Sequence, residues 1–248
     1  MCLGYVAWQT WGAEHVARKY YGIRPESISV TPAPEYVRTD IVDTVYRDMA
    51  MDELSLLDRQ ACSKIASAFN SNPWVRHVTG VTKLSGSGLD VRLEYRQPVA
   101  MVHVISRHPE YSGAGFFAVD GEGTLLPRSD FSEADVHQYL HIIAPGAYPT
   151  GRIGAAFGDV RIEAAALLAH FLHPDHKELG LTSIGVHGDL RQNPVVQLEI
   201  AGEGDQRWFW GSPPGQEVPG EPTAQMKLDT LRAGAATGSD LRQVYVAP

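Results

Sequence analysis

The sequence is poor in cysteine, with only Cys2 and Cys62 in a chain of 248 residues. One lies at the extreme terminus and the other within a predicted helix, so the pair does not make the framework of a disulfide-stapled domain. A CxxC pair is also missing. The cysteine content therefore argues against a disulfide scaffold and leaves the redox compartment open.

Long hydrophobic runs are absent. No apolar stretch reaches the roughly 18 residues that suggest a transmembrane helix, and the start lacks the pattern of a cleaved signal peptide. The beginning nevertheless has aromatic side chains followed by cations, as at the headgroup end of a transmembrane helix. A short amphipathic helix that packs on the folded body is the alternative. The residues concerned are Tyr5, Trp8, Trp11, His15, Arg18 and Lys19.

Positive charge is scarce, since 21 lysines and arginines face 29 aspartates and glutamates and give a net charge of −8. A surface this acidic repels phosphate backbones, and no basic patch interleaved with aromatic residues compensates for it. The apolar fraction of 44% and the charged fraction of 20% are ordinary for a folded soluble protein. These totals argue against a nucleic-acid partner and predict one large domain or two small ones.

Recognisable catalytic motifs are missing as well. The chain has neither a GxSxG nucleophile elbow nor an HExxH metal motif. Its glycine clusters at 86–88, 113–115, 121–123 and 202–204 lie where turns are expected, and none opens a helix as a phosphate-binding loop does. We therefore predict no catalytic residues, no cofactor and no enzyme, and expect a binding role.

The best metal candidate is a histidine cluster. His170 and His173 are three residues apart on a predicted helix and could share one ion, with Asp175 and His176 following. Pro174 ends the helix, however, and removes the fixed position that a third ligand needs. The other interpretation is a polar helix end, where cationic histidines suit the negative helix dipole. We predict no metal site and keep a hydrolase with a histidine-bound metal as an alternative.

The first part of the chain predicts the order strand, helix, helix, strand, strand. Apolar residues recur at helical spacing over 35–49, and we expect Asp58 to cap a second helix that ends at Asn70. The expected core-facing stripe of the first helix is Tyr36, Val37, Ile41, Val45 and Met49. Period-two alternation predicts strands over 27–31, 74–84, 89–96 and 99–105. Helices grouped on one face of a small sheet make an α+β layer.

The second part is richer in predicted strands. These cover 116–120, 139–144, 182–186, 195–200, 207–211 and 242–247. Ser132 is expected to cap a short helix, and Asp159 a longer one that ends near His173. A further helix is predicted over 223–233. In the long helix we expect Val160, Ala164, Leu167, Leu168 and Phe171 to form the buried face.

Four short motifs follow one another between residues 73 and 123. They are Pro73-Trp74-Val75, Val81-Thr82-Lys83, Glu94-Tyr95-Arg96-Gln97-Pro98-Val99-Ala100 and Val119-Asp120-Gly121-Glu122-Gly123. With the predicted element order, the stretch 28–123 resembles the polypeptide-transport-associated (POTRA) domain of the FtsQ/DivIB family of bacterial cell-division proteins, followed by the start of that family's β-domain. The later half resembles the β-domain more loosely, in the order of a helix, a hairpin, a helix and a last strand.

The chain also departs from that family. A Trp-Pro turn usual in the family is replaced by residues 84–88, and the loops 145–158 and 212–222 look like additions. The family has a cytoplasmic tail and a single transmembrane helix, neither of which is present in full. The aromatic start would fit the outer end of that helix.

The resemblance implies a fold and a domain division. The fold would be α+β, with a POTRA-like β-α-α-β-β domain and then a mixed or antiparallel β-domain with flanking helices. Residues 1–24 would be a membrane-proximal lead-in, 25–106 the POTRA-like domain and 107–248 the β-domain. An upstream helix would anchor the chain in the cytoplasmic membrane, with this region on the extracytoplasmic side.

The resemblance also implies a function. The protein would be a non-catalytic scaffold of the divisome that binds small coiled-coil division proteins by strand addition and helix packing. The last strand and the helix before it would make the contact, through Lys227, Arg242, Val244 and Tyr245. A second interpretation keeps the fold and assigns it to outer-membrane protein assembly or secretion. No alternating barrel strands follow here, which counts against it.

Overall fold

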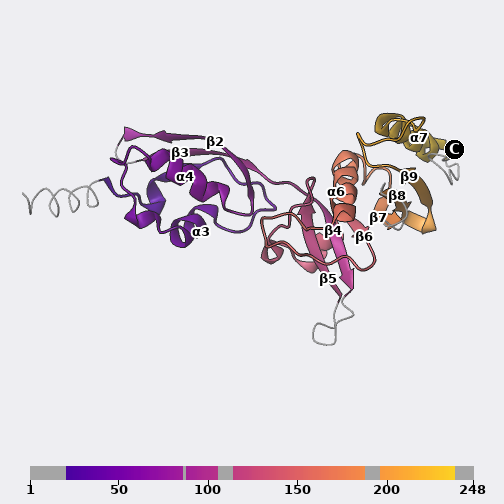
Figure 1. Cartoon of the computed structure of the whole chain (residues 1–248), viewed down its shortest axis with the longest axis horizontal. Helices are drawn as coiled ribbons and strands as arrows, with labels where there is room; N and C mark the ends of the chain where they lie inside the picture. Colours follow the sequence, from indigo (N-terminus) through magenta and orange to yellow (C-terminus); the bar gives the residue numbers. More distant parts are fainter. Residues whose placement is uncertain (1–20, 86–87, 106–113, 188–195, 238–248) are drawn as a thin grey trace, which may run out of the picture. The chain divides into compact units, whose positions relative to one another are not determined.

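The structure is a computed structural model of the chain, and it describes residues 21–85, 88–105, 114–187 and 196–237. The fold is α+β, as predicted. It divides into two compact units, with the division after Arg96 (Figure 1). Each unit has its own sheet, and each is described by itself.

The first unit is a three-stranded sheet in the order β1-β3-β2 with its helices on one face (Figure 1). Strand β3 runs parallel to β1 and antiparallel to β2. The predicted order of strand, helix, helix, strand, strand is confirmed. The elements are η2 (Pro25–Ser27), β1 (Ile28–Val30), α3 (Ile41–Asp48), η3 (Met51–Glu53), α4 (Ala61–Asn70), β2 (Val75–Lys83) and β3 (Leu89–Tyr95).

Helix α3 is shorter than predicted, because Asp40 caps it. The Asp40 carboxylate accepts a hydrogen bond from the Asp43 backbone N–H at 2.9 Å, which starts the helix at residue 41 and not at 35. The helix stops where Ala50 takes a left-handed conformation with φ 47°. Met49 therefore leaves the predicted stripe and is 44% exposed, whereas Ile41 and Val45 are buried.

Helix α4 ends at Asn70 as predicted but begins three residues after Asp58. The Asp58 carboxylate instead accepts hydrogen bonds from the Gln60 backbone N–H at 2.8 Å and from Lys64 Nζ at 2.7 Å. At the other end, Asn72 accepts a hydrogen bond from the Trp74 backbone N–H, and the Trp74 ring is fully buried. The Pro-Trp-Val step thus leads from the helix into β2 through a core aromatic residue.

The second unit is a six-stranded sheet in the order β5-β4-β6-β7-β8-β9. Strands β4, β6 and β7 are parallel, and antiparallel pairs β4–β5, β7–β8 and β8–β9 flank them. The strands are β4 (Pro98–Ile105), β5 (Ala114–Asp120), β6 (Leu140–Ile143), β7 (Leu181–His187), β8 (Gln197–Gly202) and β9 (Arg207–Gly211). The helices are η6 (Arg128–Asp130), α5 (Glu133–Val136), α6 (Val160–Leu172), η7 (Glu203–Asp205) and α7 (Ala224–Thr237).

Strand β4 corrects the predicted domain boundary. A boundary after residue 106 would place this strand in the first domain, whereas β4 pairs with β5 and β6 in the second sheet. Pro98 is the first residue of β4 and lies at a bulge, a place where the missing N–H is tolerated. The strand is nevertheless central in its sheet, since hydrophobic pairing with both neighbours outweighs the local effect of one proline.

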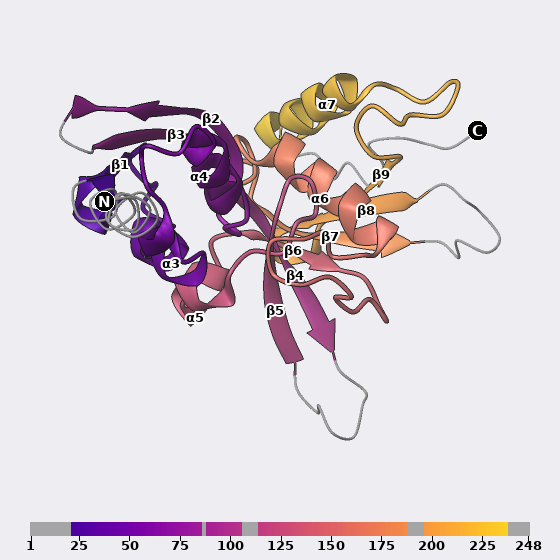
Figure 2. The ribbon, with the colours of Figure 1, turned by 60° about the vertical axis from the view of Figure 1, so that its left-hand side comes forward.

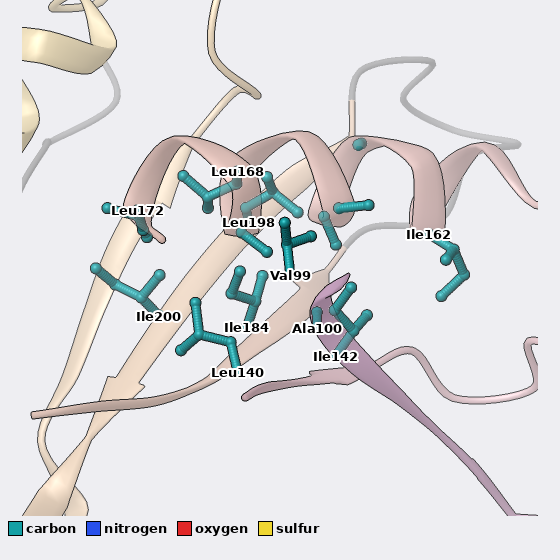
Figure 3. Close-up of a cluster of buried hydrophobic side chains, with 14 of the residues drawn as sticks. Val99, Ala100, Leu140, Ile142, Ile162, Leu168, Leu172, Ile184, Leu198 and Ile200 are labelled. Atoms are coloured by element: carbon teal, nitrogen blue, oxygen red, sulfur yellow. The ribbon is translucent and has the colours of Figure 1, made fainter. Parts of the chain in front are cut away.

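Helix α6 crosses one face of the sheet and closes the core beneath it (Figure 3). Asp159 caps the helix as predicted, by accepting a hydrogen bond from the Arg161 backbone N–H. The predicted buried face is only partly right: Ala164 and Leu168 are buried, but Val160 is 55% exposed. Small side chains let the helix approach the strands and bury more than one stripe. The buried residues of α6 are Ile162, Ala164, Ala165, Ala166, Leu168, Ala169 and Leu172.

Candidate partner-binding surface

One edge of the six-stranded sheet is formed by β9. This strand pairs with β8 along Ala201↔Arg207, Ile200↔Trp208 and Glu199↔Phe209. Within the described ranges, no strand pairs with its other side. An open edge presents backbone N–H and C=O groups that a further strand can complete.

The aromatic residues of β9 are divided between the two faces of the sheet. Trp208 and Trp210 are 8% and 0% exposed and belong to the core on the α6 side, where Trp210 lies 6.2 Å from Phe171. Phe209 lies on the opposite face and is half-buried. Because both tryptophans are packed in the core, they do not form an exposed stacking platform for a sugar, and their contribution to a partner site is to support the edge.

Helix α7 packs on the same core, on the side of the sheet that α6 covers (Figure 2). Leu228 and Leu231 of this helix are 3% and 2% exposed. Met226, on the same helix, is 60% exposed. The helix therefore offers a large apolar side chain, Met226, to solvent.

Lys227 lies inside the unit, on the inner face of α7. Its ammonium group is fully buried, 2.5 Å from the Glu221 carboxylate and 5.2 Å from the centre of the Trp210 ring. The backbone N–H groups of Ser212 and Val218 also donate to Glu221, at 2.8 and 3.0 Å. Lys227 thus fastens the loop 212–222 to α7. In the conformation described, its side chain does not reach the surface at which the resemblance implies a partner contact.

Two carboxylates of this loop have lowered pKa values. Burial alone would raise the pKa of Glu221, but hydrogen bonds from Lys227, Ser212 and Val218 outweigh it and hold the pKa below the ordinary value. Burial would likewise raise the pKa of Glu217. Backbone hydrogen bonds, such as that from the Ala224 N–H, outweigh this effect and leave the pKa lowered. Both groups are therefore charged in the folded loop near neutral pH.

The indole N–H of Trp210 is a buried donor near the β9 edge. Among the described residues, Trp210 Nε1 has no hydrogen-bond partner. A buried donor left unpaired costs about 1–3 kcal/mol. The core beneath this edge therefore carries a polar group whose hydrogen-bonding capacity is unused.

Three of the residues expected to contact a partner, Arg242, Val244 and Tyr245, lie outside the described residues. The predicted strand over 242–247 lies there too. The partner contact assigned to this region by the resemblance therefore stays a prediction.

The histidines proposed as an alternative metal site have other contacts. His176 is buried, with Nδ1 2.7 Å from the His173 carbonyl oxygen and Nε2 3.3 Å from that of Gln138. Burial lowers the pKa of His173, and the nearby His176, His170 and Lys177 lower it further. His170 packs against the turn at Gly121. Among the described residues, no group of three or more histidine, cysteine or carboxylate side chains is arranged to hold a metal ion.

Sequence reasoning did not find the Glu221–Lys227 ion pair of this site. A glutamate six residues before a lysine, across a helix start, is a common spacing with no specific meaning. Only the buried aromatic ring of Trp210, contributed by β9, makes the pair an interior one.

In the described part of the chain, no helix is both long and apolar enough to cross a bilayer. Comparison with protein-family models and with curated proteins finds no match to this sequence.

Proposed function

We propose that this chain is a non-catalytic extracytoplasmic scaffold of the bacterial division machinery, held at the cytoplasmic membrane by an upstream helix. It binds small coiled-coil division proteins through the β9 side of the second sheet, the predicted strand 242–247 and α7. The observation that supports the proposal most is the order of elements. A strand–helix–helix–strand–strand unit precedes a mixed sheet with a packed helix, a hairpin and a last helix.

The open edge at β9 supports the strand-addition mechanism. A partner strand, or the chain's own predicted strand followed by a partner strand, can continue the ladder at backbone groups that no described strand occupies. The Glu221–Lys227 pair holds α7 against Trp210 of β9, so that a strand and a helix of one core are presented together. Apolar contact from Met226, which is exposed, would add to backbone hydrogen bonds.

The mechanism is tested by Val244→Pro, which removes a backbone N–H from the predicted strand. The wild-type chain and the variant are mixed with the coiled-coil division proteins of the same cell, and captured proteins are identified by mass spectrometry. We expect capture by wild type and loss in Val244→Pro. The matched control is Val244→Ala, which keeps the N–H and should retain most of the binding. Capture by a correctly folded Val244→Pro chain would show that strand addition is not the mechanism.

The scaffold role itself is tested in native cells. Fractionation followed by intact-mass measurement should recover the protein from the membrane, as a species longer than 248 residues. A soluble cytoplasmic protein of 248 residues would refute the role, whatever the outcome with the proline variant.

A further inference from the structure

The turn that joins α6 to β7, residues 173–180, brings two histidine rings together. His173 is the C-cap of α6, and the His176 ring stacks on its ring, with the ring centres 5.3 Å apart and 25° between the planes. Backbone hydrogen bonds close the turn. The His176 N–H donates to the Leu172 carbonyl oxygen at 2.9 Å, and the Leu181 N–H donates to the His176 carbonyl oxygen at 2.8 Å. Both rings therefore have fixed positions in a tight connection.

The two rings differ in what surrounds their nitrogen atoms. His176 is 6% exposed, and each of its ring nitrogens faces an acceptor, the carbonyl oxygen of His173 at 2.7 Å or that of Gln138 at 3.3 Å. Nδ1 of His173 is buried and, in the described part of the chain, has no hydrogen-bond partner. In an imidazolium both nitrogens carry a hydrogen, so a charged His173 would hold a buried N–H without an acceptor. The closed turn therefore favours neutral His173.

The charges around His173 act in the same direction. Burial lowers the pKa of His173, and His176, His170 and Lys177 lower it further. No described carboxylate is paired with His173, since Asp175 is bound to Arg232 of α7. The other charged or titrating groups near the turn are Glu178, which is exposed, and His137, His141 and Glu203, which line a cleft that His176 and Lys177 also border.

The turn is joined to α7 through a salt bridge. Arg232 Nη2 lies 2.8 Å from the Asp175 carboxylate, whose side chain is 17% exposed. Lys227 attaches the first part of the same helix to Glu221. The Arg232–Asp175 pair is therefore a polar link between the second half of α7 and the end of α6, and any opening of the turn breaks it.

We propose that the turn 173–180 is an acid-sensitive switch, in which protonation of His173 opens the turn and separates Asp175 from Arg232 of α7. Opening lets water solvate the imidazolium that the closed turn leaves without an acceptor. The switch belongs to the fold of the second unit and does not rest on the proposed scaffold function.

The direction of the pH dependence follows from linkage. Because the closed turn lowers the pKa of His173, the open turn binds more protons below the ordinary value of 6.5. The stability of the closed turn is fully present above pH 6.5 and is lost as the pH falls below that value. The carboxylates Glu217 and Glu221, whose pKa values are lowered from 4.5, titrate outside this window.

Hydrogen exchange of the full chain, read by mass spectrometry and corrected for the intrinsic rate at each pH, measures the opening. In buffer with EDTA, we expect protection over 173–181 to fall several-fold between about pH 7.5 and about pH 5.5. The ordinary pKa of 6.5 limits this fall to about tenfold. Protection over 226–234 should fall by up to about fivefold, as expected for the loss of one partly exposed ion pair.

Variants assign the effect to the ring and to the salt bridge. His173→Phe keeps a planar ring but takes up no proton, so its protection should be the same at both pH values. His173→Gln makes the same test if the apolar ring disturbs the turn. His77→Gln, at an exposed histidine of β2, should keep the wild-type pH dependence. Arg232→Gln should lower protection over 226–234 already at about pH 7.5.

Three outcomes would overturn the proposal. The first is equal protection of 173–181 in the wild-type chain at both pH values. The second is an acid loss that persists in both His173 variants, which would assign the titration to another group. The third is an acid loss over 173–181 with unchanged protection over 226–234, which would show that the turn opens without releasing α7.

Discussion

At the scale of single residues, the buried ion pair between Lys227 and Glu221 organises the second unit's last helix and loop. Each charge is removed from water, a cost that is offset only because Trp210, Ser212 and Val218 supply further contacts. Removing one partner leaves the other buried and uncompensated. The pair is therefore strongly coupled, although it need not raise stability above that of an apolar pair.

We predict that Lys227→Met destabilises the second unit by about 3–5 kcal/mol, because it leaves the Glu221 carboxylate buried without its cation. Urea unfolding followed by tryptophan fluorescence measures the change. Lys177→Met, at an exposed lysine, is the control and should stay within about 0.5 kcal/mol of wild type. The double variant Lys227→Met with Glu221→Gln should recover part of the loss. A loss in the double variant as large as in the single one would contradict coupling of the pair.

The lowered pKa of Glu221 predicts that the stability of the second unit falls in acid. The pKa of Glu221 is lowered in the fold from the ordinary value of 4.5, so the unfolded chain binds more protons in the window below that value. Stability from this group is present above pH 4.5 and is lost as pH falls through the lowered pKa. Urea midpoints between about pH 6 and pH 3 should fall less steeply in Glu221→Gln than in the control Glu178→Gln, at an exposed glutamate. Parallel pH profiles would exclude the effect.

At the scale of elements, α6 is the centre of the second unit. Its alanines and leucines face the strands and also meet the core that α7 shares, which explains why its buried residues follow no single stripe. The sequence predicted its start and end correctly, because a cap at Asp159 and a proline at 174 are local signals. It predicted the buried face poorly, because burial depends on what packs around the helix.

We predict that Leu168→Ala lowers the stability of the second unit by about 3 kcal/mol, since it opens a cavity beneath the helix. Val160→Ala, in the first turn of the same helix, should cost less than about 0.5 kcal/mol because this side chain is exposed. Chemical unfolding of both variants makes the comparison. Equal losses would place Val160 in the core, as helical periodicity alone predicts.

At the scale of the whole molecule, the chain consists of two units with separate cores. Among the described residues, the large core cluster of the second unit contains none before Val99. The first unit closes its own core with α3 and α4 over three strands, and its fully buried residues include Ile65, Phe69 and Trp74. Two cores of this kind should unfold as two cooperative units.

We predict that Ile65→Ala, which leaves a cavity in the first unit, lowers hydrogen-exchange protection in β2 and β3 while leaving that of β6 and β7 unchanged. Hydrogen exchange read by mass spectrometry after digestion resolves the two sheets. The surface control is Lys64→Ala, next to it on α4 and exposed. An equal loss of protection in both sheets would mean that the units unfold as one.

The sequence by itself determined the α+β class and, in the part of the chain that the structure describes, the order of the main helices and strands and most of their ends. These follow from periodicity, from caps such as Ser132 and Asp159 and from turns such as that after Asp120, all of which act over a few residues. They could be predicted because local conformational preference depends on neighbours along the chain.

Only the tertiary structure decided the rest. It placed β4 in the second sheet, buried Lys227 against Trp210 and gathered histidines from β4, β6 and β7 on one face. Each of these depends on contacts between residues far apart in the sequence. Strand alternation says that His103 and Val102 face opposite ways, but only the pairing of strands and the position of α6 decide which of the two meets water.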